Sequence, residues 1–257
     1  MNPEHVLVPY QCHDLPPGPW LIFSPHADDE TFGMGGALRL AADQGISTHV
    51  IVLTDGALGG DVSDAAQTAA LVQTRQQELS AACALLGVSH TDTWDQPDRG
   101  LIPDAALSER IATAIADTGA GTVFFPGALE LHPDHRMTAQ LVWQAGQQLQ
   151  RRAWRGALPQ FWSYEISVQS PVNRLLDITA VLSTKQQAMA VYASQNSQNN
   201  YPDLIMALNK ARTFSLPATV SHAEAFCQFT DDELSDSLQA ATTAALARYF
   251  AVSETKG

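Results

Sequence analysis

Short apolar runs alternate with longer amphipathic stretches along most of the chain. The apolar runs at 20–23, 49–53 and 122–125 are predicted to be buried strands, and the segment at 91–94 is predicted to be a short strand. The amphipathic stretches at 34–44, 65–86, 104–117 and 135–151 are predicted to be helices, and glycines at 45 and 87 provide C-terminal stops for two of them. This alternation predicts an α/β fold, in which a mostly parallel sheet carries helices on both faces.

The pattern weakens after residue 160 of the chain. We expect a strand at 161–166, helices at 185–192 and 202–213, and a last helix at 232–250. The Gln/Asn-rich stretch at 195–200 is predicted to be a polar loop.

Composition and charge exclude several classes of protein. The 257 residues carry a formal charge of −13, which disfavours binding to nucleic acid or standing attachment to an anionic membrane. No apolar run approaches the ~20 residues of a membrane span, and the first residues do not resemble a signal peptide. The 3 cysteines are scattered, which favours a reducing compartment, so we expect a cytoplasmic protein.

Histidines and acids follow two of the predicted strands directly. His26, Asp28 and Asp29 come after the first strand, whereas a segment with His132 and His135 follows the strand at 122–125. The carboxyl ends of parallel strands share one edge of a sheet, so we expect these side chains to gather there.

Imidazole and carboxylate groups are the ligands of a catalytic zinc ion, which keeps one position open for water. One aspartate of the first loop could bind the ion beside His26, and the other could then take a proton from the water. The pattern does not decide between Asp28 and Asp29. The competing interpretation is that both acids simply cap the N-terminus of the next helix.

Glycines after the first loop allow a second interpretation. Gly33, Gly35 and Gly36 could cradle the phosphates of a dinucleotide. Their spacing differs from Gly-x-Gly-x-x-Gly and the preceding loop is acidic, so close packing of the helix on the sheet explains them better. A second Gly-rich loop at 54–60 either lines the same cleft or is a plain turn.

The two histidine loops together resemble the PIG-L/LmbE-like zinc N-deacetylases, which are Rossmann-like α/β enzymes. The resemblance rests on Pro25–Glu30 and His132–His135, and it continues through 33–38, 54–56, 75–78, 86–87, 97–101, 164–165 and 185–195. It implies a single domain over 1–257, with a core at about 20–200 and a C-terminal strand and helix at about 220–250.

The resemblance also implies a role for individual residues. It implies one zinc ion per chain, held by His26, Asp29 and His135. It implies Asp28 as general base and His132 as the electrostatic or acid partner, oriented by Asp134. We expect the Asp134 carboxylate to favour the charged form of the His132 ring. Arg75 and Asp98 match positions that contact the sugar; otherwise Arg75 would pair with Glu78 along its helix, and Asp98 would be a turn residue.

Two positions depart from the family pattern. Ala27 replaces the usual proline, which changes the stiffness of the loop, and Ala57 replaces a glutamate found in many relatives, which affects sugar specificity. The sequence does not assign roles to Tyr164, Glu165 or His222.

The resulting hypothesis is a zinc hydrolase that removes the N-acetyl group of an N-acetylglucosamine-type sugar or glycoconjugate and releases acetate. One alternative is a zinc amidase acting on a larger acyl conjugate. Another is a non-catalytic nucleotide- or sugar-binding domain without a metal. We expect a small amino sugar as the partner, and the chain could form a homo-oligomer.

Overall fold

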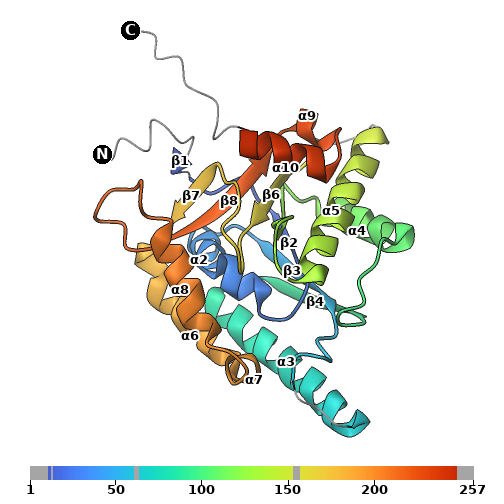
Figure 1. The fold of residues 1–257 in the computed structure, drawn as a ribbon. Coiled ribbons are helices and arrows are strands. Elements are labelled where there is room, and N and C mark those ends of the chain that lie inside the picture. Colours follow the sequence, from blue (N-terminus) through green and yellow to red (C-terminus); the bar gives the residue numbers. More distant parts are fainter. Residues whose placement is uncertain (1–10, 13, 61–63, 153–156, 248–257) are drawn as a thin grey trace.

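The computed structural model describes residues 11–12, 14–60, 64–152 and 157–247. Within them, an eight-stranded sheet has the order β1-β7-β8-β6-β5-β2-β3-β4 (Figure 1). The strands are β1 (Gln11–Cys12), β2 (Trp20–Ser24), β3 (Thr48–Thr54), β4 (His90–Gln96), β5 (Thr122–Pro126), β6 (Gln160–Tyr164), β7 (Arg174–Asp177) and β8 (Ala223–Phe229). Only the pairs of β8 with β6 and β7 are antiparallel among these strands, which confirms the predicted, mostly parallel sheet.

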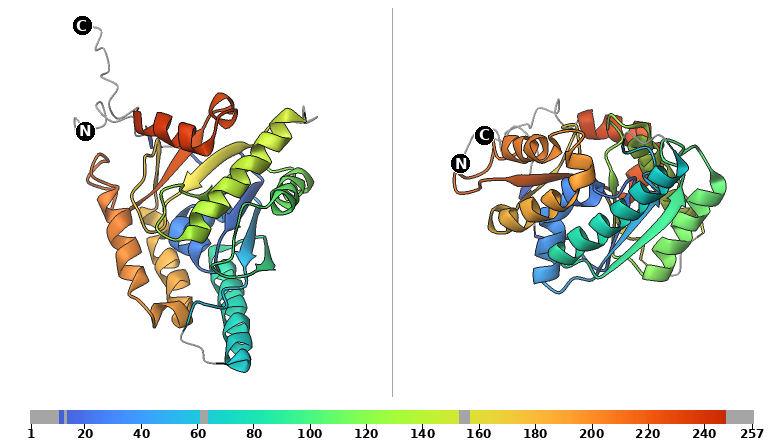
Figure 2. Two further views of the ribbon diagram at one scale, coloured as in Figure 1. Left: turned by 45° about the vertical axis from the view of Figure 1, so that its right-hand side comes forward. Right: turned by 90° about the horizontal axis from the view of Figure 1, so that it is seen from below.

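Helices cover both faces of the sheet (Figure 2). They are α2 (Asp29–Asp43), α3 (Ala65–Leu86), α4 (Ala105–Thr118), α5 (Pro133–Arg151), η1 (Thr179–Val181), α6 (Leu182–Val191), α7 (Ala193–Asn196), α8 (Tyr201–Ala211), α9 (Asp231–Leu234) and α10 (Leu238–Ala247). Side chains of α4, α5 and α10 share one buried cluster, and those of α2, α3, α6 and α8 share the other. Within the described ranges, no helix has both the length and the apolar character needed to cross a bilayer.

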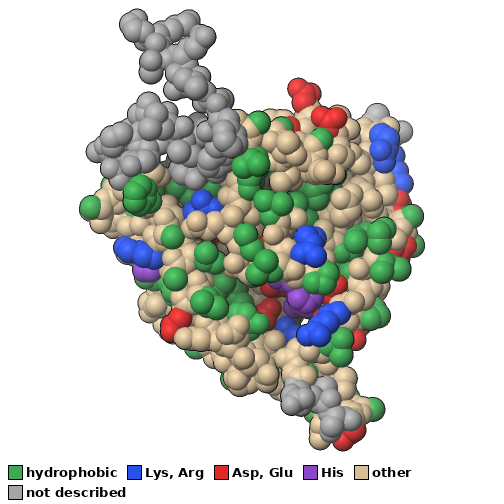
Figure 3. Space-filling view, in the orientation of Figure 1, with side chains coloured by type: hydrophobic (Ala, Val, Ile, Leu, Met, Phe, Trp, Pro, Cys, Tyr) green, Lys and Arg blue, Asp and Glu red, His purple; other side chains and the backbone are tan. Residues whose placement is uncertain are grey.

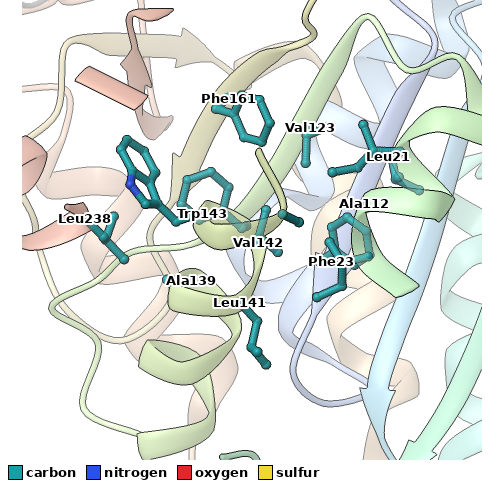
Figure 4. Close-up of a cluster of buried hydrophobic side chains, with 14 of the residues drawn as sticks. Leu21, Phe23, Ala112, Val123, Ala139, Leu141, Val142, Trp143, Phe161 and Leu238 are labelled. Carbon is teal, nitrogen blue, oxygen red and sulfur yellow. The ribbon is translucent and has the colours of Figure 1, made fainter. Parts of the chain in front are cut away.

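Strand β2 contributes to both hydrophobic cores. Leu21 and Phe23 pack in the cluster that contains Trp143 of α5 (Figure 4), whereas Trp20 and Ile22 pack in the opposite cluster. Successive side chains of a strand point to opposite faces, so a strand covered on both sides is apolar at every position. This explains the continuous apolar run in the sequence.

The order of the strands makes β2 the point at which the direction of the chain across the sheet reverses. The chain passes from β2 to β3 and β4 on one side and then returns to β5 on the other side of β2. Ligands of open α/β sheets bind at such a switch point, outside the carboxyl ends of the strands. The loops at 25–28 and 127–132 leave β2 and β5 at this point.

Several element boundaries differ from the prediction. α3 has the predicted bounds, from the Asp64 cap to Gly87, but α2 begins at Asp29 rather than at 34 because Asp28 takes the N-cap position. β6 ends at Tyr164 rather than at 166, and α7 replaces part of the polar loop predicted at 195–200. The last helix is divided into α9 and α10, and its predicted end at 250 lies outside the described residues. The short β1 and β7 were not predicted.

A buried ion pair supports an interruption of α2 at Met34, whose backbone is not helical. Glu224 accepts a hydrogen bond from the amide of Gly36 (2.7 Å), and Lys185 Nζ donates to the carbonyl of Phe32 (2.9 Å) and to Glu224 (2.6 Å). Both charged side chains are fully buried. The pair therefore satisfies backbone groups that the interruption frees on either side of it.

The glycines of α2 allow the helix to lie close to the sheet, as the sequence indicated. A Cβ atom on Gly33 would lie 2.4 Å from the Tyr164 ring, whereas one on Gly35 would make only ordinary contacts at 3.4 Å and beyond. We therefore expect Gly33→Ala to lower the free energy of unfolding by about 1–3 kcal/mol, the usual cost of overpacking. Gly35→Ala is the matched control and should stay within about 1 kcal/mol of the parent. Urea unfolding of the two variants checks this, and equal stabilities would contradict it.

Candidate metal centre

Three histidine rings, His26 and His132 from the two loops and His135 from the first turn of α5, pack against one another. The ring centroids lie 4.6 Å apart for His26 and His132, 5.2 Å for His132 and His135, and 5.4 Å for His26 and His135. Near the centre of Figure 3, histidine lies in a hollow together with acidic side chains, with basic and hydrophobic side chains around it. The structure thus brings together residues that are more than a hundred positions apart in the sequence.

The carboxylate of Asp29 lies between two of these rings. Its Oδ2 atom is 3.1 Å from His26 Nδ1 and 3.2 Å from His135 Nε2. The backbone amide of His26 also donates to Oδ2, at 3.0 Å, which holds the carboxylate in place. Two imidazole nitrogens and one carboxylate oxygen form a donor set suited to a catalytic zinc ion.

The third histidine offers another ligand set. A ring nitrogen from each of His26, His132 and His135 lies within 4.8 Å of the others. A second set of ligand atoms, from His26, Asp98, His132 and Asp134, lies equally close together. The pair of His26 and His135 can therefore be completed by His132, or by Asp29, which contacts both rings.

Acidic groups make the pocket favourable for positive charge. His26 Nε2 lies 3.3 Å from Asp134 Oδ2 and 3.4 Å from Asp98 Oδ1. Burial opposes protonation of His26, but hydrogen bonds to Asp134, Asp29 and Asp98 outweigh it and raise its pKa well above the usual value. Burial also lowers the pKa of His135, but the charge and the hydrogen bond of Asp29 outweigh it and raise this pKa to about 9. A cation bound here would meet the same attraction as these protonated rings, so the residues fit a divalent metal ion.

Asp28 is held in a strained backbone conformation beside the triad. Its φ angle is 145°, a region that costs about 1–3 kcal/mol for a residue with a side chain. Its amide donates to Glu30 Oε2 at 3.1 Å, and its own Oδ2 accepts from Arg75 Nη2 at 3.3 Å. These contacts fix both the backbone and the carboxylate of Asp28.

The two neighbouring aspartates differ in their protonation. Burial raises the pKa of Asp28 to about 7, against the lowering effect of Arg75. For Asp29, burial is outweighed by the charge and hydrogen bond of His135, which hold the pKa far below its usual range. A permanently ionised carboxylate suits a metal ligand, and a carboxyl that titrates near neutral pH suits a general base.

His132 is oriented differently from our expectation. Its Nδ1 accepts the backbone amide of Asp134 at 3.2 Å, which caps α5 and leaves the proton of a neutral ring on Nε2. The Asp134 carboxylate instead hydrogen-bonds to His26 and to the amide of Arg99 (2.7 Å). Burial and the nearby charges of His26 and His135 lower the pKa of His132, so the neutral ring is favoured rather than the charged one.

Arg75 joins the Gly-rich loop at 54–60 to the loop that carries Asp28. Its guanidinium donates to the carbonyls of Ala27 (3.0 Å) and Gly56 (3.2 Å), and the side chain is 3% exposed. Glu78 accepts hydrogen bonds from Ser194 of α7. The alternative interpretation, in which Arg75 pairs with Glu78 along α3, is therefore not what the structure shows. Arg75 therefore positions the loops and presents little surface to a substrate.

Asp98 also connects the Gly-rich loop with the cluster. Its Oδ2 accepts the amide of Leu58 at 3.0 Å, while Oδ1 faces His26. Hydrogen bonds and the charge of His26 outweigh burial and lower the pKa of Asp98 to about 2. These contacts bring the loop at 54–60 against the site. This agrees with the interpretation that the loop lines the site, rather than with that of a plain turn.

Tyr164 and Glu165 belong to the framework around the site. The Tyr164 hydroxyl is fully buried and donates to the carbonyl of Phe23 at 3.0 Å. Glu165 accepts a hydrogen bond from Arg212 Nε at 2.9 Å. His222, directly before β8, contacts the hydroxyl of the neighbouring Ser221.

Glu130 contacts the cluster but was not singled out from the sequence. Its side chain is fully buried, and its Oε2 lies 3.6 Å from His135 Nδ1. Burial is outweighed by its hydrogen-bond partners, which lower the pKa of Glu130. The neighbours Leu129 and Leu131 are exposed, at 49% and 72%. A single acid between two leucines after a buried strand was the signal that could have revealed it.

Comparisons with known proteins agree with this site. The family model described as PIG-L, GlcNAc-PI de-N-acetylase, matches residues 21–146. A diacetylchitobiose deacetylase from Thermococcus kodakarensis is 28% identical over 195 residues, which cover 68% of this chain and 69% of that protein.

Solved structures share the fold. An N,N'-diacetylchitobiose deacetylase from Pyrococcus horikoshii superposes with a TM-score of 0.71 at 21% identity, covering 81% of this chain and 82% of that one. GalB, a 4-carboxy-2-hydroxymuconate hydratase from Pseudomonas putida KT2440, gives a TM-score of 0.68 at 21% identity, covering 81% and 94%. One fold therefore accompanies two chemistries, and the reaction must be argued from the site.

Proposed function

Since the chain belongs to the PIG-L family of metal-dependent N-deacetylases, we propose that it uses one zinc ion to deacetylate an N-acetylglucosamine-type sugar or glycoconjugate, releasing acetate. The observation that carries this proposal is the position of Asp29 between His26 and His135, at 3.1 and 3.2 Å. Asp28 lies next to this triad with a pKa of about 7. A cation site and a titratable base thus lie side by side.

In the proposed site, His26, Asp29 and His135 hold the metal ion. Bound zinc supplies a Lewis acid that lowers the pKa of water to about 7. Asp28 takes a proton from the attacking water, and its hydrogen bond from Arg75 keeps the carboxylate in position.

The remaining residues act on the acetyl group and on the ligands. His132 presents an Nε2 proton, because its Nδ1 accepts the Asp134 amide, and donates it as a hydrogen bond to the oxyanion. The Asp134 carboxylate positions His26. Protonated Asp28 then returns its proton to the amine that leaves. Sugar contact by Arg75 and Asp98 stays a prediction of the family resemblance.

Acetate release from a panel of N-acetylated sugars tests the proposal. The panel contains free N-acetylglucosamine, its glycosides and N-acetylated disaccharides. We expect acetate from at least one class, loss of this activity after zinc is removed with a chelator, and recovery when zinc is added back. Full activity in the verified zinc-free protein would contradict the proposal.

Exposed apolar side chains support a second candidate, an amidase for larger acyl conjugates. Leu58, Ile102, Leu129 and Leu131 are 48%, 65%, 49% and 72% exposed. The amides of Leu58 and of Leu101, next to Ile102, donate to Asp98 and Asp134, the two acids beside His26. Leu129 and Leu131 flank Glu130, which lies beside His135, so the four come from three loops after β3, β4 and β5. Exposed apolar groups around a site favour an apolar ligand portion. Conjugates with lengthening acyl chains, added to the same panel, distinguish the candidates: turnover that rises with chain length favours the amidase.

The non-catalytic alternative has no comparable support. The glycines that could have bound phosphate pack against other side chains instead. A Cβ atom on Gly33 would lie 2.4 Å from Tyr164, and one on Gly36 would lie 2.5 Å from Ile178. A cytoplasmic location and a homo-oligomer stay predictions. The thiols of Cys83 and Cys227 are both buried.

A further inference from the structure

A buried polar atom of the proposed metal centre lacks a hydrogen-bond partner. His135 directs Nε2 toward Asp29, and its other nitrogen, Nδ1, is buried without a hydrogen bond. A ligand histidine usually donates this second N–H to a carboxylate, a carbonyl or water, which fixes the tautomer and the orientation of the ring. His135 Nδ1 therefore needs an acceptor.

Glu130 offers that acceptor. Its Oε2 lies 3.6 Å from His135 Nδ1, just outside hydrogen-bond range, and the whole side chain is fully buried. A fully buried carboxylate beside a ring nitrogen is costly unless it is paired. The position of Glu130 thus complements a donor on Nδ1.

The backbone holds Glu130 in this position from the other side. The amide of Ile166 donates to Oε1 at 2.8 Å, and the amide of Ser167 donates to Oε2 at 3.0 Å. The Ser167 hydroxyl also donates to Oε2. These three donors from Ile166 and Ser167 favour the ionised carboxylate of Glu130, because it can accept all of them. They also hold the carboxylate in place beside His135.

We propose that Glu130 is a positioning residue, whose carboxylate accepts the Nδ1 proton of His135 and so presents Nε2 to the metal ion. This inference rests on the proposed function, because His135 is a ligand only in that account. Glu130 touches neither substrate nor reacting atoms, and its effect is exerted through the affinity of the site for zinc.

Zinc affinity measured by competition with a chromophoric chelator tests this role without an activity assay. We expect Glu130→Gln to bind zinc about 10- to 100-fold more weakly than the parent, the usual effect of losing an outer partner. Glu165→Gln is the matched control, since the Glu165 side chain is only 9% exposed and its carboxylate also accepts a backbone amide, from Ser170 at 2.6 Å. It should bind zinc like the parent.

A second variant separates positioning from loosening of the loop. Ser167→Ala removes one hydrogen bond to Glu130 from the loop side and leaves the carboxylate beside His135. Its zinc affinity should stay within about threefold of the parent. Circular dichroism and thermal unfolding verify that each variant is folded.

The outcomes distinguish this inference from the proposed function. Equal zinc affinities of Glu130→Gln and the parent would overturn the positioning role and leave the deacetylase proposal intact. An equal loss in Ser167→Ala would also overturn it, because the loop would then be the cause. Weakened zinc binding in Glu130→Gln, together with a parent that releases no acetate, would support the inference and contradict the proposed function. A parent that binds no zinc would overturn both.

Discussion

Asp28→Asn should lower kcat by roughly 10²- to 10⁴-fold, the range that general acid–base catalysis contributes. The amide has the size of the carboxylate but cannot take a proton from water. Its backbone contact to Glu30 is unchanged, so the strained loop should persist. Steady-state acetate release, measured with zinc content on the same sample, checks the prediction.

Asp43→Asn provides the matched control for this variant. Asp43 lies in the last turn of the same helix, α2, and its partner is Arg39 on the surface. We expect parental kcat and zinc content. If zinc-loaded Asp28→Asn kept more than about a tenth of the parental kcat, Asp28 would not be the general base.

Asp29→Ala should lose zinc affinity, whereas His132→Ala should keep its zinc and lose catalytic rate. Asp29 is the proposed third ligand, so its loss should weaken zinc binding by more than the roughly 10- to 100-fold cost of losing an outer partner. His132 is proposed to donate to the oxyanion, so its loss should retain zinc and lower kcat by about 10²- to 10³-fold.

This pair of variants decides whether Asp29 or His132 completes the site with His26 and His135. Equilibrium zinc affinity and kcat at saturating zinc are measured for both proteins. The reverse pattern, with zinc lost in His132→Ala and kept in Asp29→Ala, would assign the third ligand to His132. The roles that the family resemblance implies would then be wrong at these two residues.

The sequence was sufficient to predict the sheet and the edge that carries the site. Strands such as β2 and β5 are apolar at every position, so their pattern is strong, and their following loops must share one edge. β7 escaped prediction because it is short and has polar ends, Arg174 and Asp177. α2 begins before its predicted start because its first turns contain Gly33, Gly35 and Gly36, which are poor helix formers and weaken the helical pattern there.

The contacts between side chains depend on distant residues, so the sequence could not give them. The guanidinium of Arg75 donates to carbonyls of two other loops, and its contact with the sugar stays a prediction. His132 was expected to be charged beside Asp134, but the close rings of His26 and His135 favour its neutral form. Such contacts depend on which groups the fold brings within a few ångströms of one another.

X-ray diffraction recorded at the zinc absorption edge tests the central claim most directly. Crystals of the zinc-loaded protein should show one anomalous peak between the loops after β2 and β5. We expect the peak at ~2.0–2.2 Å from His26 Nδ1, Asp29 Oδ2 and His135 Nε2, the usual distances of zinc ligands. A zinc-loaded crystal with no peak at these three atoms would contradict the account.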